Sequence, residues 1–258
     1  MVRRLIDISI AIENDVPFDP PVGRPRVTYM NHQETLPELA VFFPGLDPAL
    51  MPDGEFAAAE NVTLSTHSGT HLDAPYHYAS TMNQGERAIT IDEVPLDWCL
   101  QPGVKLDFRH FPDGYVVQPA DVEAELARIG HVLMPLEIVL INTRAGSRQG
   151  QADFLSAGCG MGRAATLYLL ERGVRVTGTD AWSWDAPFPY TAKRFLETRD
   201  VSLIWEGHKA GREIGYCHLE KLANLELLPP DGFVVSCFPV KIKAASAGWT
   251  RAVAMIDI

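Results

Sequence analysis

Three histidines and an aspartate fall within residues 67–77, and no other stretch constrains the fold and chemistry of this chain as strongly. His67, His71 and Asp73 supply two imidazoles and a carboxylate, which is a common ligand set for a catalytic divalent metal. Burying so polar a cluster costs free energy unless something coordinates it. The stretch therefore predicts a metal site around which the rest of the chain is organised.

The local sequence favours an extended or turning backbone in this stretch over a helix. Gly69 and the β-branched threonines beside it are weak helix formers, and Pro75 keeps the preceding residue out of the α region. In an extended strand, alternate residues point to the same side. The residues that would then share one face are His67, Gly69, His71, Asp73, Pro75 and His77.

Composition bounds the class of protein. The chain has 258 residues, of which 47% are hydrophobic, and this is enough for one large core. The net charge of −11 argues against nucleic acid and membrane partners. No apolar run follows the basic pair at 3–4, and no stretch approaches the length of a membrane span. Without an export signal, the four scattered cysteines indicate reduced thiols and a cytoplasmic protein.

Hydrophobic periodicity predicts a mixed α/β chain. Strands are expected at short apolar or alternating runs, and helices where apolar residues recur at helical spacing. The expected strands are 5–12, 26–30, 61–66, 89–94, 104–108, 137–142 and 174–178, and the expected helices are 119–129 and 163–172.

Residues 36–56 are rich in apolar side chains but are interrupted by four prolines. The apolar residues Phe42, Phe43, Leu46, Leu50 and Met51 are too many for a free linker. We expect a lid over the site or a contact between subunits. Packing into the core is the alternative, and the rarity of exposed apolar patches favours it.

A glycine-rich turn at residues 158–162 lies between an expected strand and an expected helix, which invites comparison with dinucleotide-binding turns. The spacing is GxGxG, whereas the phosphate-binding fingerprint is GxGxxG. The long polar segment 143–157 also separates the turn from the preceding strand. We therefore interpret the glycines as shaping a tight helix start and expect no nucleotide.

The stretch at 67–77 resembles the signature HxGTHxDxPxH of the cyclase-like metal-dependent hydrolases, which include bacterial kynurenine formamidase and isatin hydrolase. Every position of the signature is present, as His67, Gly69, Thr70, His71, Asp73, Pro75 and His77. The resemblance runs from about residue 5 to 254 and is weakest in 13–60 and 145–160. It implies one α/β domain, residues 1–258, with a swivelling β/β/α core, assembled as a homodimer or homotetramer. It also implies that the proline-rich loop 15–25 helps to shape the pocket.

The resemblance implies a second part of the site near the C-terminus. In the formamidase branch, a histidine at the start of a helix and a glutamate twelve residues later complete a second metal site. His208 and Glu220 have this spacing, and an exposed helix end is the alternative. His218 lies off the pattern and is expected at the surface or behind the ligands. Asp180 and Asp185 are candidates for orienting a metal-bound imidazole, with an Asx-type turn as the alternative.

The implied function is hydrolysis of a carbon–nitrogen amide bond, in an aryl formamide or a cyclic amide, by metal-activated water. One or two Zn or Mn ions are the implied cofactor, since both suit imidazole and carboxylate ligands. The implied general base is His77, because an imidazole with a pKa near 6.5 suits proton transfer at neutral pH. The implied metal ligands are His67, His71, Asp73, His208 and Glu220.

The substrate side of the site is less defined by the sequence. An aromatic cluster either walls a flat, aromatic small-molecule substrate or belongs to the core; its members are Trp182, Trp184, Phe188 and Tyr190. Hydrolysis of a lactone or another cyclic ester is an alternative activity. A non-catalytic metal-binding protein is a further alternative, against which the intact His77 argues.

Overall fold

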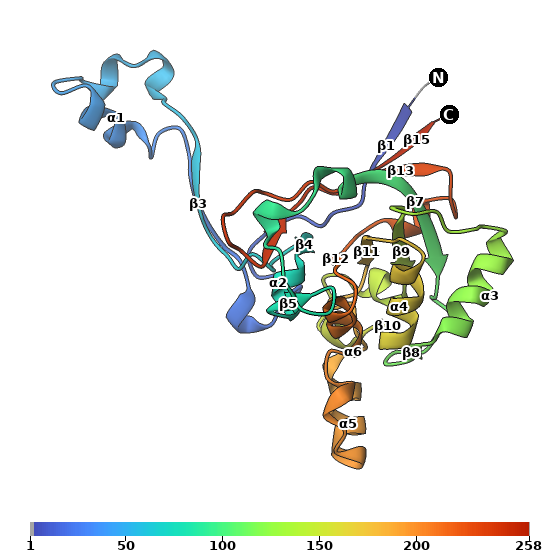
Figure 1. Ribbon diagram of the computed structural model, residues 1–258. Coiled ribbons are helices and arrows are strands. Elements are labelled where there is room, and N and C mark those ends of the chain that lie inside the picture. Colours follow the sequence, from blue (N-terminus) through green and yellow to red (C-terminus); the bar gives the residue numbers. More distant parts are fainter. Residues whose placement is uncertain (1–2, 258) are drawn as a thin grey trace.

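The computed structural model describes residues 3–257, apart from the side chain of Ala40, and its largest element is a mixed β-sheet (Figure 1). Within those residues the sheet has nine strands. Their bounds are β1 Arg3–Asp7, β4 His71–Asp73, β7 Leu100–Asp107, β9 Ile138–Asn142, β11 Val176–Thr179, β12 Cys217–Glu220, β13 Phe233–Ser236, β14 Ala247–Trp249 and β15 Val253–Asp257.

The middle of the sheet is parallel and its flanks are antiparallel. The strand order is β1-β15-β13-β7-β9-β11-β12-β4-β14, and the four strands from β7 to β12 run in one direction. In sheets of this kind ligands bind outside the carboxyl ends of the parallel strands. The helices of the described residues are α1 Leu36–Phe42, α2 Pro75–Tyr78, α3 Pro119–Ile129, α4 Arg163–Glu171, α5 Phe188–Thr198 and α6 Glu206–Lys209.

Both faces of the sheet centre are covered by apolar side chains. On β9, Ile138 and Leu140 belong to one hydrophobic cluster, and Val139 and Ile141 belong to the other. The second cluster includes the buried residues of α3 and α4, which lie over that face (Figure 1). A strand buried on both sides explains why residues 137–142 read as a continuous apolar run and not as an alternating one.

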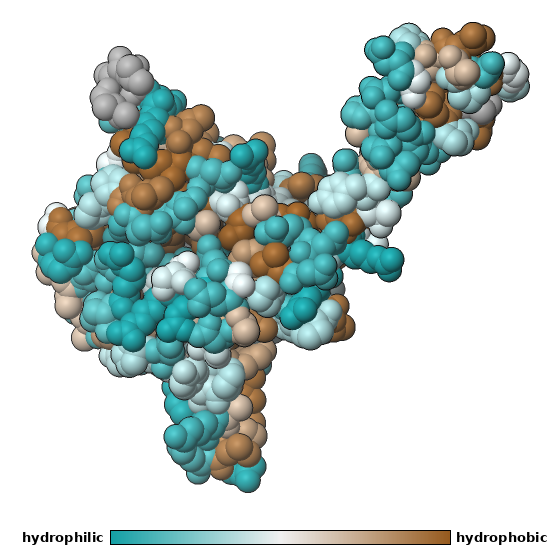
Figure 2. Space-filling view, turned by 180° about the vertical axis from the view of Figure 1, so that it is seen from behind, coloured by the Kyte–Doolittle hydropathy of each residue, from teal (hydrophilic) through white to brown (hydrophobic). Residues whose placement is uncertain are grey.

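Residues 26–63 form an arm that projects from the body (Figures 1 and 2). Its shaft is the antiparallel pair of β2 Arg26–Met30 and β3 Ala59–Thr63, and its tip carries α1. The apolar side chains of the tip are exposed at Val41, Phe42, Phe43, Leu50 and Phe56. Packing of residues 36–56 into the core of the body, the alternative that the sequence left open, is therefore wrong.

Most of the expected elements occur, and 26–30 and 119–129 have the expected bounds. The run 89–94 is not a strand: Thr90 and Glu93 form a capping box, which starts a 3-10 turn at Ile91–Glu93 instead. The glycine-rich turn does shape a helix start, because Gly162 is the N-cap of α4. A Cβ on Gly160 would lie 1.9 Å from the backbone nitrogen of Ala186, so only glycine fits there.

The remaining short strands pair as β5 Thr81–Met82 with β6 Glu86–Arg87, and as β8 Val116–Val117 with β10 Gly160–Met161. Among the described residues, none of the helices combines the length and the apolar character that a membrane crossing requires.

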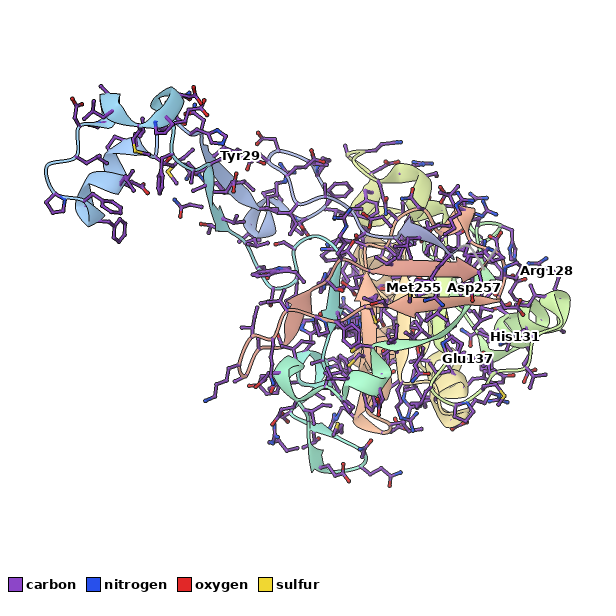
Figure 3. All side chains as sticks on the ribbon, turned by 90° about the horizontal axis from the view of Figure 1, so that it is seen from above. Tyr29, Arg128, His131, Glu137, Met255 and Asp257 are labelled. Atoms are coloured by element: carbon purple, nitrogen blue, oxygen red, sulfur yellow. The ribbon has the colours of Figure 1, made fainter. Side chains whose placement is uncertain are left out.

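His131, just after α3, lies near Glu137 (Figure 3) and joins two loops by ion pairs. Its Nε2 lies 3.0 Å from Glu137 Oε2, and its Nδ1 lies 3.0 Å from Asp231 Oδ2. Burial opposes protonation of this imidazole, but the two carboxylates outweigh burial and raise the pKa of His131. A raised pKa in the folded state means that protonated His131 stabilises the fold. This contribution is complete below the unfolded pKa of about 6.5 and is lost as the pH rises through the folded pKa.

We predict that His131→Gln lowers the free energy of unfolding more at pH 6 than at pH 9, because the imidazole loses its proton, and with it the charged pairs, as the pH rises through its raised pKa. Urea denaturation at the two pH values measures the difference. His110→Gln is the control, since the imidazole of His110 packs on Phe111 with ring centroids 4.1 Å apart. An equal loss at both pH values would show that the charge of His131 contributes nothing.

Candidate metal centre

The pairing of β4 with β12 brings four polar side chains together. In this antiparallel register Asp73 lies opposite His218, and His71 lies opposite Glu220. Directly opposed residues project to the same face of a sheet with their Cβ atoms about 5 Å apart. The residues between them, Leu72 and Leu219, point the other way and are buried in the hydrophobic core.

The motif at 67–77 does not form the single extended strand that its sequence predicts. A turn precedes β4, and Gly69 within it has φ of +65°, where a Cβ would also meet Ile12 at 3.0 Å. Pro75 occupies the first position of α2, where its missing N–H costs nothing. The turn and the helix bend the chain around Asp73, so that His67 Nδ1 lies 2.8 Å from Asp73 Oδ1. His77, four residues after Asp73, places Nε2 3.8 Å from Asp73 Oδ2.

His208 lies on the short helix α6 and faces the same cluster. Its Nδ1 contacts Asp185 Oδ2, and its Nε2 lies 3.5 Å from Glu220 Oε1. Asp185 also accepts hydrogen bonds from the backbone N–H groups at 207 and 208, at 2.7 and 3.0 Å. This carboxylate therefore holds the start of α6 and the orientation of the imidazole at once, which matches the role expected for Asp185. The alternative prediction, that His208 and Glu220 lie at an exposed helix end, is wrong because both residues are buried.

Asp180, the other expected orienting residue, does not contact a histidine of the cluster. It accepts hydrogen bonds from the side chain of Asn142 and from the backbone and hydroxyl of Thr143. Asp180 thus ties the end of β9 to the end of β11, and that part of the expectation is wrong.

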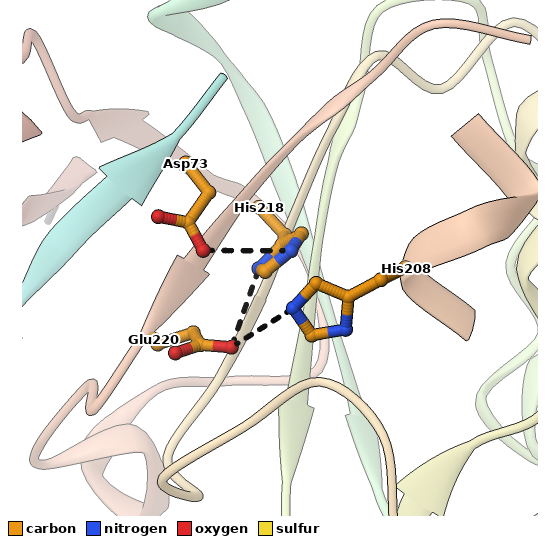
Figure 4. A group of neighbouring side chains, drawn as sticks. All are labelled: Asp73, His208, His218 and Glu220. Atoms are coloured by element: carbon orange, nitrogen blue, oxygen red, sulfur yellow. Dashed lines mark ion pairs between the residues drawn. The ribbon is translucent and has the colours of Figure 1, made fainter. Parts of the chain in front are cut away.

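The expectation that His218 lies at the surface is wrong, because it is buried within the cluster (Figure 4). The side chain is fully buried, with Nε2 3.6 Å from Asp73 Oδ2 and Nδ1 3.7 Å from Glu220 Oε1. The ring lies between Tyr78 and Trp184, at centroid distances of 5.9 and 6.2 Å. Strand alternation could have found it, because residues 218 and 220 share one face of any strand.

Several buried polar atoms of the cluster have no hydrogen-bond partner among the described residues. They are His71 Nε2, Asp73 Oδ2 and both ring nitrogens of His218. His71 Nε2 lies 3.2 Å from Asp73 Oδ1 and 3.6 Å from Glu220 Oε2, while its Nδ1 contacts the Gly69 carbonyl at 2.9 Å. Orphaned atoms of this kind are costly in a folded core, and an ion that binds them removes the cost.

The donor atoms form two groups that share Asp73. Within each group all atoms lie within 4.8 Å of one another. One group is Asp73, His208, His218 and Glu220, and the other is His67, Asp73 and His77. His71 contacts Asp73 and Glu220 as well. Imidazole nitrogens and carboxylate oxygens in this arrangement fit a divalent cation.

The electrostatics suit the binding of a cation. Burial opposes the ionisation of Glu220, but its histidine neighbours outweigh burial and lower its pKa to about 2. Burial lowers the pKa of His218 to about 3 and that of His77 to about 4, well below the 6.5 expected for His77. For His208, burial is outweighed by Asp185 and Glu220, which raise its pKa to about 10. At neutral pH the cluster therefore presents ionised carboxylates, neutral imidazoles at 77 and 218, and a protonated imidazole at 208. Binding of a metal ion by His208 would release that proton.

A cavity of about 200 Å³ opens beside the cluster. Its aromatic walls are Trp182, Phe188 and Trp205, and Trp205 stacks on His208 with centroids 4.8 Å apart. Trp184, expected with the other aromatics, is instead buried and donates its indole N–H to Thr166 at 3.0 Å. The aromatic cluster thus divides between pocket and core, except for Tyr190, which is exposed and does not line the cavity. Trp205 was missed because a lone tryptophan carries no local signal of its neighbours.

Relatives of known name are similar to this chain over most of its length. The chain is 28% identical over 225 residues to the isatin hydrolase of Roseibium aggregatum, covering 79% of this chain and 77% of that protein. It is 26% identical over 198 residues to cyclase-like protein 1 of Arabidopsis thaliana, covering 75% and 73%.

Solved structures agree on the α/β fold. An isatin hydrolase bound to the product analogue thioisatinate matches with a TM-score of 0.75 at 21% identity, over 99% of this chain and 93% of that one. Isatin hydrolase A from Ralstonia solanacearum matches with a TM-score of 0.77 at 19% identity, over 99% and 92%. The family model described as "Putative cyclase" matches residues 6–186, well over half of the chain. The resemblance seen in the sequence is confirmed, and the chain belongs to the Cyclase family.

Proposed function

We propose that this protein is a metal-dependent hydrolase that cleaves a carbon–nitrogen amide bond in a small aromatic substrate. The observation that carries the proposal is the cluster around Asp73. Its inner members His71, Asp73 and His218 have buried polar atoms without partners. Its outer members line an aromatic-walled cavity, and they are His67, His77, His208 and Glu220. The similarity to isatin hydrolase supports hydrolysis as the reaction type. It also makes a cyclic amide the first substrate class to test, ahead of an aryl formamide.

The proposed ligands of one or two Zn or Mn ions are His67, His71, Asp73, His208 and Glu220, with His218 added by the structure. Asp73 belongs to both groups of donor atoms, so it is the residue that would bridge two ions. A bound divalent ion would polarise the substrate carbonyl and lower the pKa of a water molecule. Asp185 keeps the imidazole of His208 turned toward Glu220.

We propose His77 as the base. Its imidazole is neutral at neutral pH because burial lowers its pKa, so its ring nitrogen is free to accept a proton. The ring lies beside the cavity, 4.1 Å from the ring of His67 and 5.2 Å from that of Trp205. A proton taken up there is close to Asp73, which stabilises the imidazolium, and can pass to the leaving amine. The aromatic walls would hold the substrate ring, and the small cavity excludes bulky substrates.

The proposal is tested with a panel of isatins, formanilides and aromatic lactones, assayed with protein loaded with Zn or Mn. We expect hydrolysis of isatin or a formanilide, and loss of that activity on treatment with a chelator. Turnover of lactones alone would make the protein a cyclic ester hydrolase. A protein that binds metal but turns over no member of the panel would support the non-catalytic alternative.

We predict that His77→Ala keeps its metal while the rate falls by about 10²–10⁴, the usual worth of a positioned acid–base group. His218→Ala and His71→Ala should lose metal and activity together, since each removes a buried donor nitrogen from the cluster. Elemental analysis and kinetics on the three variants measure both quantities, with His110→Ala as the control. If His77→Ala loses as much metal as His218→Ala, His77 is a ligand and the mechanism has no base.

We also propose that the chain forms a homodimer or homotetramer through the arm. The exposed apolar tip has no cover within one described chain, and residues 31–60 carry six acidic and no basic side chains. Changing Phe42 and Phe43 to serine should shift the molar mass in light scattering toward the monomer. Val132→Ser is the control, because Val132 is equally exposed on the body. An unchanged mass would place the subunit contact elsewhere.

A further inference from the structure

Lys221 follows the proposed ligand Glu220 and has an unusual combination of properties. Its backbone lies in the left-handed region, with φ of +57°, where non-glycine residues are rare. Its side chain is 1% exposed, although lysine is seldom buried without a partner. A residue is held in such a conformation only when its surroundings determine it, and this often marks a functional site.

The contacts of Lys221 join four segments of the site. Its backbone N–H donates to the carbonyl of Ala181 at 3.0 Å, and its own carbonyl accepts from the hydroxyl of Thr70 at 2.6 Å. Its ammonium donates to Asp19 Oδ1 and, at 2.7 Å, to the carbonyl of His67. One residue thus connects the end of β12 to the motif turn, to the loop after β11 and to the proline-rich loop 15–25.

The one buried charged side chain of loop 15–25 is Asp19, and the ammonium of Lys221 is its ion-pair partner. Asp19 is 4% exposed, and its second oxygen, Oδ2, has no hydrogen-bond partner among the described residues. Together with Pro20 and Gly23, Asp19 lines the same cavity as the aromatic side chains. Removing one partner of a buried ion pair leaves an uncompensated charge, which the loop escapes by moving Asp19 into water.

We propose that Lys221 is a positioning residue, whose ammonium fixes loop 15–25 as a wall of the cavity beside the cluster and thereby sets substrate affinity. The ammonium is fixed by Asp19 and by the His67 carbonyl, so it acts through the loop and not on the reacting atoms. The affinity part rests on the proposed function, whereas the anchoring of the loop does not.

The test compares Lys221→Met with the double variant Lys221→Met, Asp19→Asn. The single variant leaves Asp19 unpaired, and the double variant removes both charges at similar volume, so the melting temperature should fall in the first and recover in the second. Amide exchange of residues 15–24, followed by mass spectrometry, should quicken in both. With isatin or formanilide as the probe, whichever the wild type hydrolyses, KM should rise at least about tenfold in both while kcat changes less than about threefold. Bound metal should stay at the wild-type ratio.

Lys105→Met is the matched control, because Lys105 is also buried but donates to the Leu228 carbonyl away from the cavity. It should leave loop exchange and KM unchanged. A double variant that regains the wild-type KM together with its stability would reduce Lys221 to a structural ion pair and overturn the proposal. Unchanged exchange of residues 15–24 would overturn it too. If the wild type hydrolyses neither probe, the proposed function fails, and loop exchange alone decides whether Lys221 anchors the loop.

Discussion

The register between β4 and β12 is the constraint on which the site depends. It sets Asp73 against His218 and His71 against Glu220, although the two strands lie far apart in the sequence. A slip of β4 by one residue would turn its two polar side chains, His71 and Asp73, into the core and bring Leu72 to the side of the cluster. Leu72 and Leu219 prevent this slip, because each is fully buried on the opposite face. Hydrophobic packing on one side of the sheet thus decides which polar groups meet on the other.

The buried carboxylates of the site require compensating positive charge. Two carboxylates and several imidazoles converge where water is excluded, which is costly unless positive charge is supplied. A metal ion is one source of that charge, and the ammonium of Lys221 is a permanent one at the edge of the cluster. The acidic chain can therefore hold its acidic cluster without surrounding it with further basic side chains.

Local signals made some parts of this structure predictable from the sequence. The helix at 119–129 begins with proline and has a capping box. In the motif at 67–77, residue type and spacing indicate the metal-binding side chains. The place of Trp205 beside His208 could not be read in the same way, because its neighbours come from other elements. Gly69 and Pro75 indicated that the motif is not a long helix, but they did not predict that the chain bends around Asp73. What the sequence lacks is the long-range pairing that turns a list of polar residues into one centre.

The arm and loop 15–25 lie outside the strands that carry the donors, and the arm joins the body only at the ends of β2 and β3 (Figure 1). Changes of length or composition in such segments leave the pairing of β4 with β12 untouched, since loops tolerate insertions that a sheet register does not. This division allows the chemistry to stay constant in evolution while the choice of substrate and of partner drifts. Sequence similarity between relatives should accordingly decay fastest in the first quarter of the chain.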